Sequence, residues 1–164
     1  MKNSSEMHFL GGEFLLWLYW KSCEEGSVSL DNLGLGDISI SFEEMITLDS
    51  ITGDGYRESV MSQDISELQS VRDSIAKGRV PVSAKIRMIE KDLEWFFSLR
   101  SEPLKMSSVK LPSTAGGEDV AAISLRLESI VRLELVMKGL FNSFLIERGV
   151  EETPAELKDF LGIK

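Results

Sequence analysis

The chain begins with a region whose apolar residues lie on every side of a helix. From residue 8 to residue 24 large hydrophobic side chains dominate, with few charged positions between them. A helix with one exposed face would show a polar side, so the helix predicted here must be covered from several directions. Gly26 follows, where a glycine commonly ends a helix. We expect residues 1–7, which are mostly polar, to form a disordered N-terminus.

The hydrophobic period then changes from helical spacing to alternation, which is typical of strands with one buried face. Ile38, Ile40 and Phe42 alternate with serines. The same reasoning predicts further strands at residues 28–30, 45–48, 56–63 and 104–111. Glycine-containing turns separate several of these strands.

Residues 81–100 predict a β-hairpin. Apolar residues alternate with polar ones on both sides of a turn at residues 90–92. Because the side chains of a strand point alternately to its two faces, Lys85 and Arg87 are expected together on one face, with their neighbours directed to the core.

Two further helices follow from the spacing of apolar residues and from capping residues. Residues 64–77 carry apolar side chains at helical spacing, with Asp64 as the expected N-cap and Glu67 as its capping-box partner. Residues 118–148 form the longest predicted helix, with an apolar stripe along its length.

These elements define an α+β fold class: an antiparallel sheet of about five to seven short strands, flanked by an N-terminal helix, a middle helix and a long C-terminal helix. At 164 residues the chain is expected to form a single domain over residues 8–149. Residues 150–164 are expected to form a short C-terminal helix or tail, with Thr153 as N-cap and Pro154 at the first helical position.

Residues suited to catalysis are scarce in this chain. It has one histidine, His8, and one cysteine, Cys23, which excludes zinc sites built from these residue types. We interpret Cys23 as a packing residue and carboxylate pairs such as Glu43 and Glu44 as solvated surface. A metal-dependent nuclease built from converging acids is the enzymatic alternative that the sequence leaves open. We therefore expect a protein without catalytic residues, bound metal or cofactor.

The cysteine count and the apolar run also bear on the compartment. A single cysteine forms no intramolecular disulfide, which favours a reducing environment. The apolar run after residue 8 fits poorly as a secretory signal and is too short to span a bilayer. We therefore expect a cytoplasmic protein that does not contact a membrane.

The formal net charge is −9, which opposes binding to nucleic acid. Charge is unevenly distributed, however, since residues 77–110 hold eight basic and four acidic residues and so carry a local charge of +4. A basic region on an acidic protein attracts polyanions. The competing interpretation is that exposed strand faces simply carry Lys and Arg. The candidate phosphate contacts are Lys77, Arg79, Lys85, Arg87, Lys91 and Arg100.

Several short motifs occur in the order found in one known family. Residues 9–22, FLGGEFLLWLYWKS, match the pattern F-L-G-x-[ED]-F-L-T-W-L-W-[WFY]-[KR]-S, with Leu16 where Thr is usual. Further matches fall at residues 76–80, 95–99, 108–112 and 126–148. On these motifs the chain resembles the C-terminal region of RdgC-like recombination-associated proteins.

The resemblance implies nonspecific binding to duplex DNA and restraint of recombinase filaments. In well-known members a large N-terminal region helps to build a DNA-encircling dimer, and this sequence does not contain that region. The chain is therefore expected to act as an accessory module, or as one part of a pair with an RdgC-like N-terminal partner chain.

Two functions are consistent with these observations. The first is a non-enzymatic recombination-associated protein that binds duplex DNA or supports a DNA-binding partner. The alternative is a protein–protein interaction or oligomerisation domain, such as a homo-oligomer, that makes no contact with nucleic acid. In that alternative an apolar patch forms the interface. The candidate interface residues are Trp17, Trp20, Phe141 and Phe144.

Overall fold

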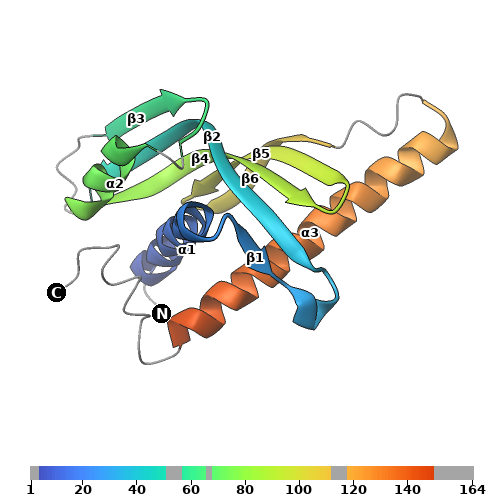
Figure 1. Ribbon diagram of the computed structural model, residues 1–164, viewed down its shortest axis with the longest axis horizontal. Coiled ribbons are helices and arrows are strands. Elements are labelled where there is room, and N and C mark those ends of the chain that lie inside the picture. Colours follow the sequence, from blue (N-terminus) through green and yellow to red (C-terminus); the bar gives the residue numbers. More distant parts are fainter. Residues whose placement is uncertain (1–3, 51–56, 66–67, 112–117, 150–164) are drawn as a thin grey trace.

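The computed structural model describes residues 4–50, 57–65, 68–111 and 118–149. Six strands and three α-helices make up this part of the chain (Figure 1). The elements in chain order are α1 Ser4–Glu24, β1 Ser27–Ser29, the 3-10 turn η1 Asp31–Leu33, β2 Asp37–Ser50, β3 Arg57–Ser62, α2 Gln69–Ala76, β4 Arg79–Glu90, β5 Leu93–Ser101, β6 Leu104–Lys110 and α3 Val120–Gly149.

The strands form one antiparallel sheet in the order β1-β2-β4-β5-β6, with β3 also paired to β2. The long strand β2 pairs with β1 near its start and with β3 near its end. Its pairing with β4 shifts register between Phe42 and Ile46, where Glu44 has a positive φ of 63°. The predicted strands at 38–42 and 45–48 are therefore one bulged strand. The α+β prediction, with an antiparallel sheet and three helices, is confirmed.

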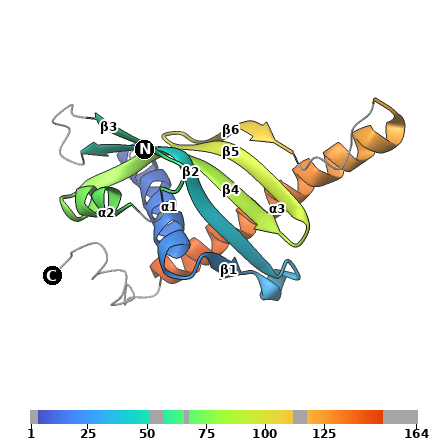
Figure 2. The same cartoon turned by 45° about the horizontal axis from the view of Figure 1, so that its top comes forward.

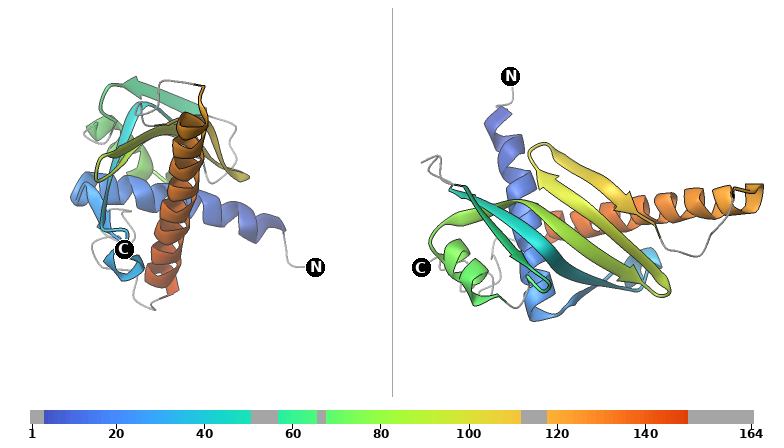
Figure 3. Two further views of the ribbon diagram at one scale, coloured as in Figure 1. Left: turned by 90° about the vertical axis from the view of Figure 1, so that its right-hand side faces the viewer. Right: turned by 90° about the horizontal axis from the view of Figure 1, so that it is seen from above.

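Helix α1 forms a middle layer between the sheet and α3. It contacts β2, β4 and β5 on one side and α3 on the other (Figures 2 and 3). The ring of Phe14 packs edge-on against Phe141, 5.1 Å away, and Trp17 packs against Phe144 at 6.0 Å. This double cover explains why α1 is apolar around its circumference, as the sequence predicted.

A glycine permits the closest approach between α1 and the sheet. A Cβ atom built on Gly11 would lie only 2.0 Å from the backbone oxygen of Ser101, at the end of β5. No side chain fits there, because backbone on both sides fixes the separation. The neighbouring Gly12 has open space around it.

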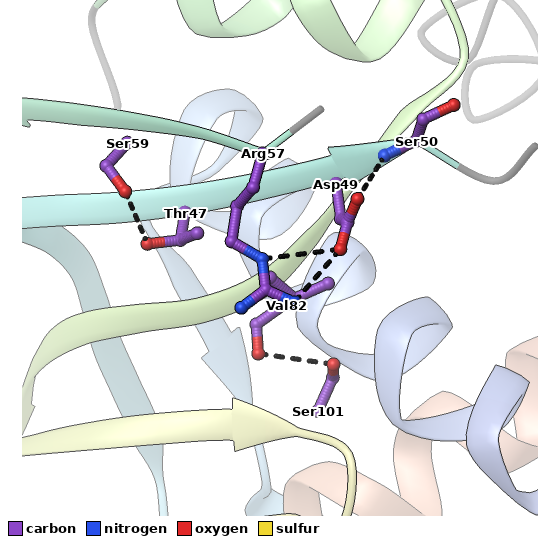
Figure 4. A network of polar contacts seen from close by, with 7 residues as sticks. All are labelled: Thr47, Asp49, Ser50, Arg57, Ser59, Val82 and Ser101. Carbon is purple, nitrogen blue, oxygen red and sulfur yellow. Dashed lines mark hydrogen bonds and ion pairs between the residues drawn. The ribbon is translucent and has the colours of Figure 1, made fainter. Parts of the chain in front are cut away.

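The same end of the sheet is joined by polar contacts, shown in Figure 4. Thr47 on β2 and Ser59 on β3 share a hydrogen bond between their hydroxyls at 3.1 Å. Arg57 donates two hydrogen bonds to Asp49 Oδ2, from Nε at 3.3 Å and from Nη2 at 3.1 Å. These contacts link β3 to β2 through side chains in addition to the backbone ladder.

Helix α2 starts later than its sequence indicates. It begins at Gln69, and its N-cap Leu68 makes no side-chain capping bond, so the capping box predicted at Asp64 is wrong. The cause lies in the sheet, because Ile65 is fully buried and its backbone N–H donates to the carbonyl of Phe42 at 2.9 Å. Tertiary burial thus overrides the local helix signal. Glu67 lies outside the described residues.

Helix α3 starts close to its predicted position. The backbone N–H of Ala122 donates to Asp119 Oδ1 at 2.8 Å, the bond expected of an N-cap. With 30 residues the helix is about 45 Å long. Its first half extends beyond the edge of the sheet, while its second half packs on α1 (Figures 1 and 3).

Two further predictions concern the ends of the chain. Helix α1 begins at Ser4, which is earlier than the predicted residue 8. The expected C-terminal helix or tail at 150–164 lies outside the described residues. None of the helices in the described ranges combines the length and apolarity that a membrane span requires.

Candidate functional site

The outer face of the sheet collects basic residues from three strands. Strand pairing places Arg87 opposite Phe96 and Lys85 opposite Ser98, on the face directed away from α1. The same face carries Arg100 with its cross-strand neighbour Lys105. Lys110 of β6 lies opposite Phe96 and completes the group. The outer basic face is therefore formed by Lys85, Arg87, Arg100, Lys105 and Lys110.

Acidic residues neutralise part of this outer basic face. Lys85 forms an ion pair with Glu44, and the hydrogen bond from Lys85 lowers the pKa of that carboxyl. Arg87 binds Glu94 and also lies 3.6 Å from Glu43, and the hydrogen bond with Glu94 raises the pKa of the guanidinium. Glu43 and Glu44, which form these ion pairs from β2, both lie in the bulge of that strand. On this face, Lys110 also interacts electrostatically with Glu44, and Arg100 and Lys105 form no ion pair among the described residues.

The other predicted phosphate contacts lie elsewhere. Lys77 and Arg79 are at the start of β4 beside α2, where Arg79 lies 3.8 Å from Glu58. Lys91 occupies the hairpin turn at the opposite end of β4, with a positive φ of 53°. The structure thus brings together Lys85, Arg87 and Arg100 but not the remaining three residues of the predicted set.

The aromatic residues predicted as an interface pack inside the molecule. Trp17, Trp20 and Phe144 are at most 4% exposed, and Phe141 is half-buried. Trp17 Nε1 donates to Glu147 Oε2 at 2.7 Å, which connects α1 to the end of α3. Trp17 and Phe144 hold the two helices together and present little surface to a partner, whereas the half-buried Phe141 keeps part of its ring accessible.

The first half of α3 carries six of the large apolar residues that are exposed among the described residues. We call residues 120–131 the α3 arm. Val120 is 81% exposed and Leu127 is 58% exposed, although both are large aliphatic residues. The other exposed large apolar residues of the arm are Ile123, Leu125, Ile130 and Val131. An apolar surface of this kind on one helix is typical of a contact with another molecule.

Two contacts mark the end of the α3 arm and the beginning of the packed half. The buried indole of Trp95 donates from Nε1 to Ser129 Oγ at 2.9 Å. Arg132 donates from Nε to Glu90 Oε2 at 2.8 Å, and its second nitrogen binds the other oxygen of the same carboxylate. That hydrogen-bonded pair raises the pKa of the Arg132 guanidinium. The hairpin tip is thereby fixed to the middle of α3.

Beyond these contacts an open groove lies between the second half of α3 and strand β6. Its volume is about 410 Å³. We call it the α3–β6 groove. Apolar side chains line most of it, and the charged groups of Lys105, Glu134 and Lys138 also border it. The apolar lining residues are Phe14, Leu99, Leu104, Met106, Met137 and Phe141.

Two features of the described part of the chain bear on the needs of catalysis, namely its potential metal ligands and its one cysteine. No group of three or more His, Cys, Asp or Glu residues is placed to hold a metal ion among these residues. Cys23 is half-buried beside Tyr19 and Arg72, and burial raises the pKa of its thiol. A raised pKa keeps the sulfur protonated at neutral pH, which is unfavourable for nucleophilic chemistry.

Comparison with protein-family models, curated proteins and solved structures finds no match to this chain. The resemblance to RdgC-like proteins therefore stays a prediction. Sequence reasoning found the apolar stripe of the long helix but missed that the α3 arm is uncovered. The signal that was available is the abundance of large apolar residues on more than one side of residues 120–131.

Proposed function

We propose that the chain is a non-enzymatic protein-interaction module and that the α3 arm is its contact surface. The observation that supports this function is the exposure of six large aliphatic residues on one projecting helix. Soluble monomers rarely present apolar patches larger than a few hundred Å², and larger ones commonly mark interfaces. The α3–β6 groove continues this surface along the same helix.

The fold supports the arm in a way that suits an interface. Asp119 caps its first turn, and the contacts of Ser129 and Arg132 anchor its far end to the sheet. An arm anchored in this manner is presented in one orientation, so little conformational entropy is lost when a partner binds. This distinguishes the arm from a helix whose apolar side chains are exposed by loose packing.

The test uses a charge introduced into the arm and a matched control on its other side. Leu127→Glu places a carboxylate on the proposed contact side, and Leu125→Glu places one about 160° around the helix. Wild-type chain and both variants are immobilised and exposed to an extract of the source cells containing the untagged chain. We expect wild type and Leu125→Glu to retain the same protein, whether a copy or another chain, and Leu127→Glu to lose it. Equal retention by all three would exclude the arm as the contact.

Binding of duplex DNA, which the RdgC-like resemblance implies, is the second candidate function. The observation that favours it is the outer basic face, where Arg100 and Lys105 form no ion pair with an acidic residue among the described residues. Phosphate contacts from such a face would be independent of base sequence. The ion pairs of Lys85 and Arg87 and the net charge of −9 count against strong binding.

Fluorescence anisotropy with a labelled duplex tests this second function. If the face binds DNA, affinity falls steeply as salt is raised, because each neutralised phosphate releases counterions. Arg100→Glu combined with Lys105→Glu is then expected to weaken binding, while Lys77→Glu, outside the face, has a much smaller effect. Absence of binding at low salt would remove this candidate.

A further inference from the structure

Four of the six exposed apolar residues of the arm lie in one stripe with two half-buried apolar residues of α3. Val120, Ile123, Leu127 and Ile130 are separated by three, four and three residues. The same alternation continues through Glu134 to Met137 and Phe141. Alternating steps of three and four residues are the seam spacing of paired helices. We call this set the outward stripe.

A second set of α3 residues is buried more deeply, whereas Met137 and Phe141 of the outward stripe are half-buried and pack against the edge of the core. Leu133, Val136, Leu140 and Phe144 are buried in the core. Each step of one residue turns the helix by about 100°, so this core set and the outward stripe lie on neighbouring sides of α3. The exposed sides of the outward stripe are therefore available to a second helix while Phe141 keeps its contact with Phe14.

From this arrangement we propose that the partner of the outward stripe is a second copy of the chain, paired antiparallel along α3. This inference rests on the proposed interaction function and names its occupant. Each copy's arm lies in the α3–β6 groove of the other. The contact is isologous, since the same helix supplies both the arm and one wall of the groove, and a two-fold axis closes the dimer.

The positions of the stripe residues support a two-fold pairing centred at the level of residue 132. Leu127 and Met137 are each five residues from that level, and Ile123 and Phe141 are each nine residues from it. An antiparallel pair therefore places Leu127 against Met137 and Ile123 against Phe141. The exposed half of the stripe in one copy thus meets the groove half in the other.

Charge along the helix also favours a second copy. The whole chain carries −9, so two copies repel each other over most of their surfaces. Between residues 120 and 141 there are three basic and two acidic residues, namely Arg126, Arg132 and Lys138 with Glu128 and Glu134. The acid within the stripe, Glu134, is paired to Lys138 on the same helix at 3.1 Å. The outward stripe thus presents no unpaired carboxylate to the second copy.

Analytical ultracentrifugation over a concentration series tests whether the chain forms a dimer. Wild type is expected to form a dimer, and Leu127→Glu is expected to raise its dissociation constant at least about 100-fold, because both copies lose a buried leucine. The matched control Leu125→Glu, with the same residue type and similar exposure, is expected to dimerise as wild type does. Circular dichroism of each variant establishes that the fold is retained.

Disulfide trapping tests the antiparallel geometry. In a Cys23→Ser background, chains with Leu127→Cys are mixed with chains carrying Lys138→Cys and oxidised. Position 138 borders the groove and is exposed, so its replacement costs little. The mixed arm-to-groove disulfide is expected to form faster than the arm-to-arm disulfide.

The outcomes separate this inference from the proposed function. If the wild-type chain stays monomeric and retains a different protein, and Leu127→Glu no longer retains that protein, the proposal of a second copy is overturned and the interaction function is kept. A dimer that Leu127→Glu leaves intact overturns the inference, and with unchanged retention it overturns the function as well. Preferential arm-to-arm trapping overturns the antiparallel pairing.

Discussion

Helix α1 and the α3 arm are both rich in large apolar residues, yet the protein encloses the first and leaves the second in solvent. In α1 the run from residue 14 to residue 20 is buried throughout. In the arm, Val120 and Leu127 remain more than half exposed. The enclosed helix has the sheet on one side and α3 on the other, whereas the arm passes the edge of the sheet (Figure 1).

The difference shows that the apolar composition of a helix indicates how much of its surface must be buried. It does not indicate whether the same chain or another molecule buries that surface. For α1 the cover is intramolecular, and its removal exposes the core. For the arm we infer an intermolecular cover, so changes there are expected to alter association while stability of the single chain stays nearly constant. This contrast can be measured with pairs of matched substitutions.

The largest expected effect comes from the aromatic contact between the enclosed helix and α3. Phe144→Ala removes a ring that packs on Phe14 and Trp17, and it is expected to lower the free energy of unfolding by about 3–5 kcal/mol. Leu127→Ala, in the exposed arm of the same helix, is expected to change it by less than about 0.5 kcal/mol. Denaturant titration of dilute chain measures both. Similar losses for the two variants would contradict the comparison.

A glycine pair within α1 tests how tightly that helix is enclosed. Gly11→Ala forces a methyl group against the backbone of Ser101 and is expected to destabilise the fold by about 2–3 kcal/mol. Gly12→Ala has open space and is expected to stabilise it by about 0.5–1 kcal/mol, since alanine favours a helix. Thermal unfolding of the two variants gives shifts of opposite sign. Shifts of the same sign would show that α1 is less closely packed against β5.

The boundary between the packed half and the arm depends on a buried carboxylate. Glu90 is 1% exposed, and Arg132→Ala leaves its charge without the guanidinium that binds it. We expect a loss of about 2 kcal/mol, smaller than for a fully buried pair because Arg132 is partly solvated. The control Lys138→Ala breaks an exposed pair within the helix and is expected to cost less than about 0.5 kcal/mol. Urea unfolding curves compare them.

The smallest expected effect is a difference in thiol reactivity between the enclosed helix and the arm, which leaves the free energy of unfolding unchanged. Burial raises the pKa of Cys23 at the end of α1, so its reactive thiolate is scarcer at pH 8 than in an ordinary cysteine. Leu127→Cys in a Cys23→Ser background places a thiol on the arm instead. At submicromolar chain concentration we expect alkylation of the arm thiol to be at least about 10-fold faster. Equal rates would indicate that the enclosed helix opens readily.

Much of the fold was predictable because its signals are local. Alternation identified β2, the hairpin of β4 and β5, and the facing of Lys85 and Arg87. The capping signal at Asp64 was equally local but wrong, since burial of Ile65 against the sheet determines where α2 begins. Local patterns therefore succeed where no distant segment competes for the same residues.

The candidate sites depend on contacts between distant segments, which spacing alone does not provide. Glu44 reaches Lys85 from 41 residues away because of the bulge in β2, and sequence gave no sign of that pairing. In the sequence, aromatic residues such as Trp17 and Phe144 give the same signal whether they are buried in a core or contact a partner. In the structure both are buried in the core. The stripe of α3 was predicted, but its exposure follows from where the sheet ends.

Strand β6 lies at one end of the sheet order, and its shape has a consequence for behaviour at high concentration. Its pairing with β5 is interrupted near Ser108, where φ is 53°, and its exposed lysines Lys105 and Lys110 flank this bulge. Bulges and lysines on an outer strand prevent strand addition from a neighbouring molecule. Crowded chains are therefore expected to form finite, reversible assemblies through their helices and to resist growth into cross-β fibres.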